Sequence, residues 1–447
     1  MPPVGQAERQ WILDMTEQIV IVGGGAGGLE LACKLGRKLG RDAVTLVDRQ
    51  LFHVWKPSLH EVAAGTLDIH QEGMSYEMLA HDNGFRFVFG AMTGLDAAAH
   101  EVSVAAVHDE RGDELIPPRQ IPYDVLVIAV GSTSNYFGVP GAAEHTVSLN
   151  SPADAEQFRM TMLKLLTSAE LRRVAGGEAT VDIVIIGAGA TGVELAAELR
   201  EASIVHSHYG FRRIDPVRDV RLTLLEGADR ILAPLPEKVS EAAAVLLGER
   251  GVRIETGCRV TGITANEVTD AQGRSFPADL VVWAAGIKAP EFLSTLGLPT
   301  ACSGAIEVGP DLRVNGHDSI FALGDCAFCL SGDGTPVPPR AQAAHQQASF
   351  LYKALVRRAR GDRGAPDDRY VYKDYGSLVS IGTRDSVGNL MGNLFRSTWY
   401  VQGLVARLMY ASLHLMHHRA VLGTIRTGVL AIARFLVRRA TPQVKLH

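Results

Sequence analysis

Two continuous apolar runs stand out along the chain, and each leads through a glycine-rich turn into a segment with helical periodicity. They are Ile19–Val22, within QIVIVGGGAGGLE, and Ile183–Ile186, within VDIVIIGAGATGVE. Uninterrupted β-branched runs of this length predict buried parallel strands, and the apolar spacing that follows each turn predicts a helix. The chain is therefore expected to contain two strand–turn–helix units of an α/β protein.

Each predicted turn carries the pattern Gly-x-Gly-x-x-Gly. The glycines are Gly23, Gly25 and Gly28 in the first turn and Gly187, Gly189 and Gly192 in the second. In such a turn the first glycine permits a tight bend, the second lets the backbone approach a diphosphate, and the third lets the helix pack on the strand. Since a helix N-terminus favours an anion, the two motifs predict two dinucleotide-binding sites.

An acidic residue ends the strand that follows each motif. Asp48 follows the predicted strand 43–47, and Glu226 follows the predicted strand 220–225. A carboxylate at this place accepts hydrogen bonds from a ribose diol, although Asp48 could also be a solvated loop residue. Glu226 favours NADH over NADPH because it repels a 2′-phosphate, but Arg230 lies close enough to leave that choice open.

Three further buried strands end in turns of small residues, and they suggest how the chain is divided. Their turns present Gly131, Ala285-Gly286 and Gly324-Asp325. We expect a discontinuous first dinucleotide-binding domain (residues 18–150 and 290–388), a second one between them (151–289) and a C-terminal segment (389–447).

The C-terminal segment differs in charge from the rest of the chain. After Asp385 there is no Asp or Glu, but there are eight Arg or Lys, so the rest of the chain carries the whole net negative charge. Residues 399–416 and 421–436 show helical amphipathicity, with Arg407, His414 and His418 on a face opposite the apolar residues. This pattern favours helices lying in a membrane interface. A dimerisation or core-docking hairpin is the alternative.

Composition narrows the function without deciding it. A length of 447 residues suits two or three domains, and a net charge of −5 argues against general nucleic-acid binding. Five cysteines suit a reducing compartment. Cys326 and Cys329 form a C-x-x-C that could be redox-active or half of a metal site, but no second pair lies nearby, and we interpret them as small buried residues. No metal site is expected.

With these residues in place, the sequence resembles the bacterial type II NADH dehydrogenases, which are single-subunit respiratory NADH:quinone oxidoreductases. The resemblance rests on these stretches: TLVDR, WKPSLHEVAAG, VGSTSN, GATGVELAAEL, VWAAGIKAP, LGDCA, PPRAQAAHQQA and YKDYGSLVS. It implies a glutathione-reductase-like flavoprotein fold with two Rossmann-like dinucleotide-binding domains and a C-terminal amphipathic-helical membrane anchor.

The resemblance also implies a role for each position that matches the family's motifs. FAD would bind at Gly23, Gly25, Gly28, Asp48, Lys56, Gly131, Gly324 and Asp325, and NADH at Gly187, Gly189, Gly192, Glu226, Ala285 and Gly286. Gln342, His345 and Gln346, which by spacing alone could be a solvated helix face, would form the quinone site. Glu194, by itself an ordinary first-turn helix acid, would lie near the nicotinamide and the flavin and take part in catalysis.

The function implied is transfer of a hydride from NADH to FAD and of two electrons to a membrane quinone, ubiquinone or menaquinone, without proton pumping. The protein would be peripheral on the cytoplasmic face of the cell membrane, in contact with the bilayer through residues 389–447, and a homodimer is a reasonable expectation. The alternatives are a soluble NADH-dependent reductase or oxidase and an NADH-binding redox sensor. A sulfide:quinone oxidoreductase is disfavoured because no cysteine falls between Cys33 and Cys258.

Overall fold

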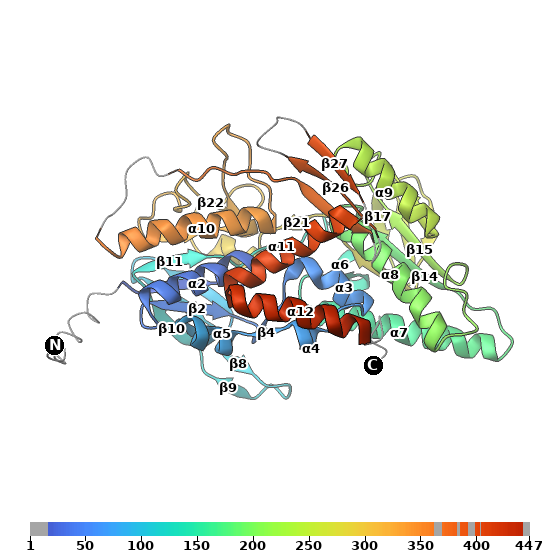
Figure 1. Cartoon of the computed structure of the whole chain (residues 1–447), viewed down its shortest axis with the longest axis horizontal. Coiled ribbons are helices and arrows are strands. Elements are labelled where there is room, and N and C mark those ends of the chain that lie inside the picture. Colours follow the sequence, from blue (N-terminus) through green and yellow to red (C-terminus); the bar gives the residue numbers. More distant parts are fainter. Residues whose placement is uncertain (1–16, 362–368, 382–384, 392–397, 403, 441–447) are drawn as a thin grey trace.

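Two parallel five-stranded sheets organise the computed structural model, which describes residues 17–361, 369–381, 385–391, 398–402 and 404–440 (Figure 1). The first sheet has the order β23-β11-β1-β2-β5, with β1 Ile19–Val22, β2 Val44–Asp48, β5 Arg86–Phe89, β11 Val125–Ile128 and β23 Ile320–Ala322. The second has the order β13-β20-β14-β15-β16, with β13 Val147–Ser148, β14 Val181–Ile186, β15 Val220–Leu225, β16 Val252–Glu255 and β20 Leu280–Trp283. Both predicted strand–turn–helix units are confirmed.

The third glycine of each motif explains why its helix can lie so close to its strand. Helix α2 (Ala26–Leu39) follows the first motif, and helix α8 (Ala190–Tyr209) follows the second. A Cβ added at Gly28 or at Gly192 would lie 1.9 Å from the carbonyl oxygen of the first glycine of the same motif. Any side chain there would push the helix off the sheet.

Other elements cover the first sheet and extend it. Helix α10 (Ala341–Arg358) runs beside α2, so a segment from late in the chain covers the first motif (Figure 1). The remaining elements of this half are α5 (Tyr76–Asn83), the antiparallel strands β6 (Met92–Asp96), β7 (Glu101–Val104) and β10 (Arg119–Pro122), and the hairpin of β8 (Val107–His108) and β9 (Glu114–Ile116).

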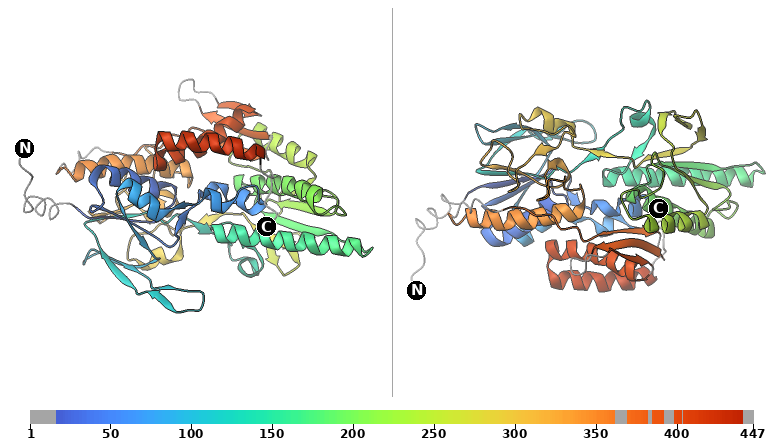
Figure 2. Two further views of the ribbon diagram at one scale, coloured as in Figure 1. Left: turned by 60° about the horizontal axis from the view of Figure 1, so that its bottom comes forward. Right: turned by 90° about the horizontal axis from the view of Figure 1, so that it is seen from above.

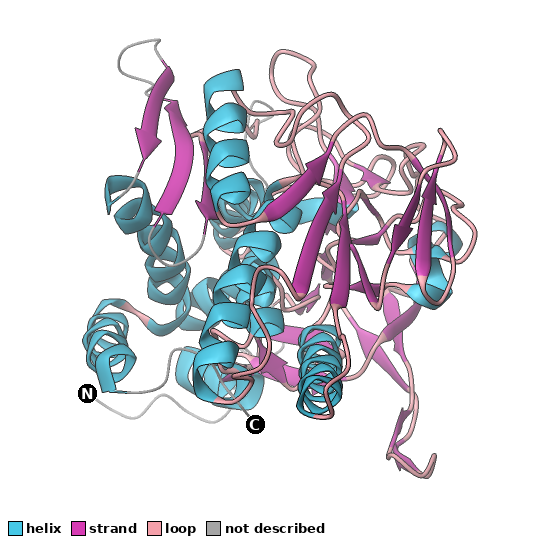
Figure 3. Ribbon diagram, turned by 90° about the vertical axis from the view of Figure 1, so that its right-hand side faces the viewer, coloured by secondary structure: helices cyan, strands magenta, loops and turns pink. Residues whose placement is uncertain are grey.

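The second sheet is flanked by long helices (Figure 3). Helix α7 (Pro152–Val174) begins at a capping box, in which Ser151 Oγ accepts from the Asp154 amide and the Asp154 carboxylate accepts from the Ser151 amide. The other elements of this half are α9 (Glu237–Glu249) and the antiparallel strands β17 (Val260–Ile263), β18 (Glu267–Asp270) and β19 (Ser275–Pro277).

Short elements connect the two halves and shape the space between them. They are β3 (Phe52–His53) paired with β4 (Met74–Ser75), β12 (Thr133–Ser134) paired with β21 (Ile287–Lys288), β22 (Ile306–Glu307) paired with β24 (Ala327–Phe328), α3 (Leu59–Ala64), α4 (Ile69–Glu72), α6 (Ala142–His145), and the 3₁₀ turns η1 (Lys56–Ser58), η2 (Glu291–Thr295) and η3 (Gly324–Cys326).

The C-terminal part corrects the sequence prediction. A helix was expected from residue 399, but the structure has an antiparallel sheet of β25 (Ser377–Ile381), β26 (Asp385–Met391) and β27 (Thr398–Gln402). The proposed boundary at residue 389 therefore falls inside β26. Strand β26 contains Asp385, Ser386, Gly388 and Asn389, residue types that are common in turns, and its pairing with β25 and β27 overrides that local preference.

Two helices follow, and they form an outer layer on one side of the molecule (Figure 2). They are α11 (Leu404–Leu422) and α12 (Thr424–Ala440). The histidines of α11 were expected to face away from the apolar residues, but His418 is buried, and His414 packs against the ring of Trp55. The histidine side of α11 thus faces the body of the protein. Among the described residues no helix is both long and apolar enough to cross a membrane.

Candidate functional site

A large cavity is lined by residues at the carboxyl ends of strands from both parallel sheets. Its volume is about 2240 Å³, well above the size of an ordinary single-ligand pocket. Of the predicted site residues, its lining includes Gly23, Gly25, Asp48, Lys56, Gly131, Gly189, Glu194, Gly286, Gly324, Asp325, Gln342, His345 and Gln346. Gly28, Gly187, Gly192, Glu226 and Ala285 are not part of that lining.

The two strand-end acids hold the two glycine turns in the same way. Asp48 accepts hydrogen bonds from the amides of Gly24 (2.6 Å) and Gln50 (2.7 Å). Glu226 accepts them from the amides of Ala188 (2.7 Å) and Ala228 (2.9 Å). Each carboxylate therefore fixes the backbone of its glycine turn, a role that the sequence analysis did not foresee.

The helix that follows each turn begins without a side-chain cap. Gly25 is the N-cap of α2 and Gly189 is the N-cap of α8, and an added Cβ at either position would meet no atom within 4 Å. Unpaired amides and the positive end of the helix dipole thus point into open space. The diphosphate of a dinucleotide such as FAD or NADH fits this arrangement, because its oxygens can accept from these amides.

A chain of hydrogen bonds connects Lys56 with Asp325, two of the residues predicted to bind FAD. Lys56 Nζ donates to the carbonyl of Ser132 (3.0 Å), and Ser132 Oγ donates to Asp325 Oδ2 (2.8 Å). Burial lowers the pKa of Lys56, and Asp325 opposes that shift. The buried Gln347, which the sequence analysis missed, accepts from the amide of Gly324 (2.7 Å) and so fixes the loop that carries Asp325.

Glu194 lies in the first turns of α8, where the two halves meet the C-terminal sheet. Its Oε1 accepts from the amide of Ser380 in β25 (3.0 Å), and its Oε2 lies 3.7 Å from His60 Nδ1 in α3. Burial raises the pKa of Glu194 to about 8, and burial lowers the pKa of His60 to about 4. Both side chains are therefore neutral near pH 7, and Glu194 carries a proton.

The three polar residues of α10 all face the cavity, yet they differ in their partners. Gln342 Oε1 accepts from the hydroxyl of Tyr372 (2.8 Å) and weakly from the amide of Tyr375 (3.4 Å). Gln346 is paired at both ends with the backbone of Lys373, through Nε2 (2.8 Å) and Oε1 (3.0 Å). Of these two glutamines, Gln342 is therefore the one held through its side-chain oxygen alone, with its NH₂ group facing the cavity as a hydrogen-bond donor.

His345, the third of these residues, is paired with a carboxylate of α2, the helix that follows the first glycine motif. Its Nδ1 meets Oε2 of Glu30, a fully buried residue of α2 that also contacts Lys34 and Ser349. Glu30 lies two residues after the last motif glycine. An acidic residue at that place in a helix is common, so the sequence did not mark it as a site residue.

Other residues of the cavity wall come from the segments on either side of the WKPSLHEVAAG stretch and from the tail. The hydroxyl of Tyr76 (2.8 Å) and Nδ1 of His53 (2.9 Å) both donate to the carbonyl of Gly24 in the first glycine turn. His53 Nε2 lies 2.8 Å from Nε2 of His417 in α11. Helix α11 thus closes one wall of the cavity. No local sequence pattern predicts this long-range contact.

None of the five cysteines, all within the described residues, lines the cavity. Four are buried, and burial raises the pKa of the Cys33 thiol to about 12 and of the Cys326 and Cys329 thiols to about 11. Such thiols are protonated and unreactive at neutral pH. This cavity therefore presents no cysteine side chain to a substrate.

Comparisons with known proteins agree with this arrangement. A family model described as pyridine nucleotide-disulphide oxidoreductase matches residues 17–348. The type II NADH:quinone oxidoreductase of Haemophilus influenzae is 38% identical over 447 residues, covering 96% of this chain and 100% of that protein. The protein of the same description from Mycobacterium tuberculosis is 29% identical over 412 residues, covering 90% of this chain and 84% of its own.

Solved structures show the same fold. The structure of NDH2 from Plasmodium falciparum in complex with NADH has a TM-score of 0.80 at 17% identity and covers 97% of this chain and 100% of that chain. The sulfide:quinone oxidoreductase of Aquifex aeolicus has a TM-score of 0.68 at 17% identity, covering 92% of each chain. At such identities the likeness concerns the fold alone, so the fold does not by itself choose between these activities.

The raised pKa of Glu194 predicts a pH-dependent stability. In the unfolded chain this carboxyl titrates near 4.5, and in the folded protein it titrates near 8. Between these values folding takes up a proton, so the contribution of Glu194 to stability is full below about pH 4.5 and is lost as the pH rises through 8. Glu194→Gln cannot ionise. Its free energy of unfolding should therefore rise relative to that of the native protein as the pH rises from 5 to 8, by several kcal/mol at most.

Thermal unfolding at a series of pH values checks this, with the exposed Glu241→Gln as the control. Parallel curves for the native protein and Glu194→Gln would contradict it.

Proposed function

The chain belongs to the type II NADH:quinone oxidoreductase family, and from this premise we propose how its residues divide the work of moving electrons from NADH to a quinone. Members of this family are FAD-containing oxidoreductases whose substrates are NADH and a quinone. The observation that carries the division is the shared cavity, which has an uncapped helix N-terminus on each of two sides and the face of α10 on a third.

We assign FAD to the first sheet and NADH to the second. The uncapped start of α2 holds the FAD diphosphate, Asp48 lies at the ribose, and Lys56, Gly131, Gly324 and Asp325 line the path toward the flavin ring. Bound FAD supplies a carrier that accepts a hydride and releases electrons to a second substrate. The discontinuous FAD domain (18–150 and 290–388) is supported by β23, which joins the first sheet after the chain has left the second.

On the second sheet, the start of α8 holds the NADH diphosphate, and Glu226 is placed toward the adenosine ribose. The turn at Ala285-Gly286 flanks the nicotinamide end of the site. Glu194 lies between this end and the first sheet, and because it is protonated near pH 7 it adds no negative charge where a hydride has to pass. We propose that it also holds a proton for quinone reduction.

We place the quinone against α10, where Gln342, His345 and Gln346 line the cavity. Gln342 is the side chain that can donate to a quinone carbonyl, because its oxygen is already engaged with Tyr372. Gln346 instead holds the Lys373 backbone that forms the neighbouring wall. His345, positioned by the buried Glu30, is suited to hold a proton at the same end.

Gln342→Glu tests the quinone assignment, because it keeps the acceptor for Tyr372 and removes the amide donor. We expect reduction of the bound FAD by NADH to keep its native rate and reoxidation by a short-chain quinone to slow by about tenfold, the worth of a hydrogen bond to a carbonyl. Anaerobic stopped-flow absorbance measures the two steps separately.

The control is Gln272→Glu, which makes the same charge change at an exposed site remote from the cavity. Native quinone rates in Gln342→Glu would remove Gln342 from the quinone site. A loss confined to the NADH step would also do so.

We propose that α12 carries the protein to the membrane surface as a peripheral enzyme on the cytoplasmic face of the cell membrane. Five of its apolar side chains are exposed: Ile425, Val429, Leu430, Ile432 and Leu436. Large apolar residues gathered on one outer helix are unusual in a protein that contacts only water. The tail also lacks acidic residues, so anionic headgroups attract it.

Other parts of the sequence prediction stay predictions. Neither a homodimer nor transfer without proton pumping follows from the contacts of this chain. The choice between ubiquinone and menaquinone is also open.

A triple variant, Ile425→Ser/Val429→Ser/Ile432→Ser, tests the membrane surface. Since each fully buried aliphatic side chain contributes roughly 1.5–3 kcal/mol, we expect the fraction bound to phosphatidylglycerol-containing vesicles to fall by about tenfold or more. Vesicle cosedimentation measures it, and NADH oxidation with a soluble short-chain quinone should be unchanged.

Leu171→Ser/Val174→Ser/Val245→Ser, which changes three exposed apolar residues of α7 and α9, is the matched control. Equal binding by both variants would show that α12 is not the membrane surface.

A further inference from the structure

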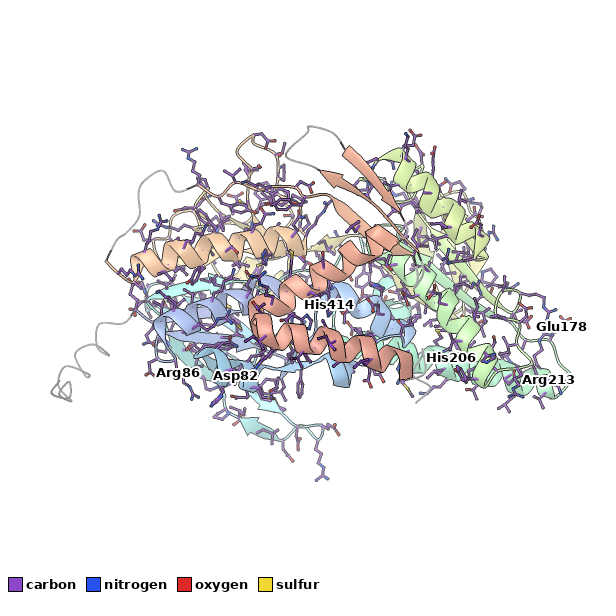
Figure 4. All side chains as sticks on the ribbon, in the orientation of Figure 1. Asp82, Arg86, Glu178, His206, Arg213 and His414 are labelled. Carbon is purple, nitrogen blue, oxygen red and sulfur yellow. The ribbon has the colours of Figure 1, made fainter. Side chains whose placement is uncertain are left out.

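A cluster of potential metal ligands lies outside the cofactor cavity, between α4 and the C-terminal helix α11. It consists of Glu72, His414 and His418, and one ligand atom of each lies within 4.8 Å of those of the other two. His414 Nε2 lies 3.9 Å from Glu72 Oε2. Figure 4 labels His414 on the part of α11 that lies over the body of the protein.

The two histidines are arranged as ligands on a helix usually are. Their spacing of four residues places them on one face of α11, and their rings lie 4.3 Å apart. His418 Nδ1 lies 2.9 Å from the carbonyl of His414. Because a carbonyl can only accept, Nδ1 must be the donor, and the neutral ring then carries its lone pair on Nε2, the nitrogen that can bind a metal.

The cluster is also shielded from solvent. His418 is 3% exposed, and the side chains of Glu72 and His414 are 14% and 19% exposed. A surface group of acids and histidines would be fully hydrated, but here the ligands come from two distant segments that already pack together.

We propose that Glu72, His414 and His418 form a binding site for a divalent transition metal of the Zn²⁺ class. Two imidazoles and one carboxylate are a typical ligand set of zinc, with a water molecule in the fourth position. Tetrahedral ligands of zinc lie about 3.4 Å apart, so closing the site requires shifts of about an ångström within side-chain reach. This goes beyond the proposed function, which needs no metal, and departs from the sequence prediction that no metal site is present.

The metal would fasten α11 to the wall of the cofactor cavity. The ring of His414 lies 5.0 Å from that of Trp55, which lines the cavity, and His417 of the same helix contacts His53. A bond from α4 to α11 therefore holds in place the segment that closes this wall, and from which α12 continues.

Zinc titration of the FAD-loaded, chelator-treated protein tests the site. In competition with a chromophoric chelator we expect one Zn²⁺ per chain, and Glu72→Gln and His418→Asn should each weaken binding at least tenfold. Co²⁺ in place of Zn²⁺ should give the intense visible absorption of a tetrahedral ion in the native protein, and that absorption should be lost in both variants. Retained FAD absorbance shows that each variant is folded.

The exposed His81→Asn is the matched control and should bind Zn²⁺ as the native protein does. The site is refuted if the native protein takes up no stoichiometric Zn²⁺. It is also refuted if folded Glu72→Gln, which removes a ligand from outside α11, binds Zn²⁺ as tightly as His81→Asn.

Discussion

The structure depends on one constraint, which is that two helices must begin without side-chain caps directly at the ends of two buried strands. Glycine at the third motif position lets each helix pack within contact of its own turn, since a Cβ would lie 1.9 Å from a carbonyl oxygen. The strand-end carboxylates of Asp48 and Glu226 then hold the turn backbone from the other side. The helix amides left over lie at one cavity, and we propose that the two dinucleotides bind to them.

The C-terminal part of the chain forms part of the wall of this cavity. The amide of Ser380 in β25 reaches Glu194 at the start of α8, and His417 of α11 reaches His53 beside the first glycine turn. Each contact brings a late segment of the chain to a residue near one motif. The same tail that exposes apolar side chains on α12 therefore also lines the cavity in which we propose that the substrates meet.

The sequence predicted the parts of the fold that local chemistry determines. Both strand–turn–helix units, their glycines and their strand-end acids follow from short patterns with a physical reason at each position. Strand β26 did not, because its polar and glycine residues form a strand only when β25 and β27 supply their hydrogen bonds. The pairing of Glu30 with His345 and the support of Gly324 by Gln347 were also missed, since each joins segments far apart in sequence and resembles an ordinary helix residue locally.

We propose that one cavity passes electrons from NADH on the second sheet to a quinone at α10. Anaerobic stopped-flow absorbance of the FAD-loaded protein tests it most directly, with NADH added first and a short-chain quinone second. We expect fast loss of the flavin absorbance with NADH and fast recovery with the quinone. Recovery only with oxygen or with a protein acceptor would contradict the account, because α10 would then face no quinone.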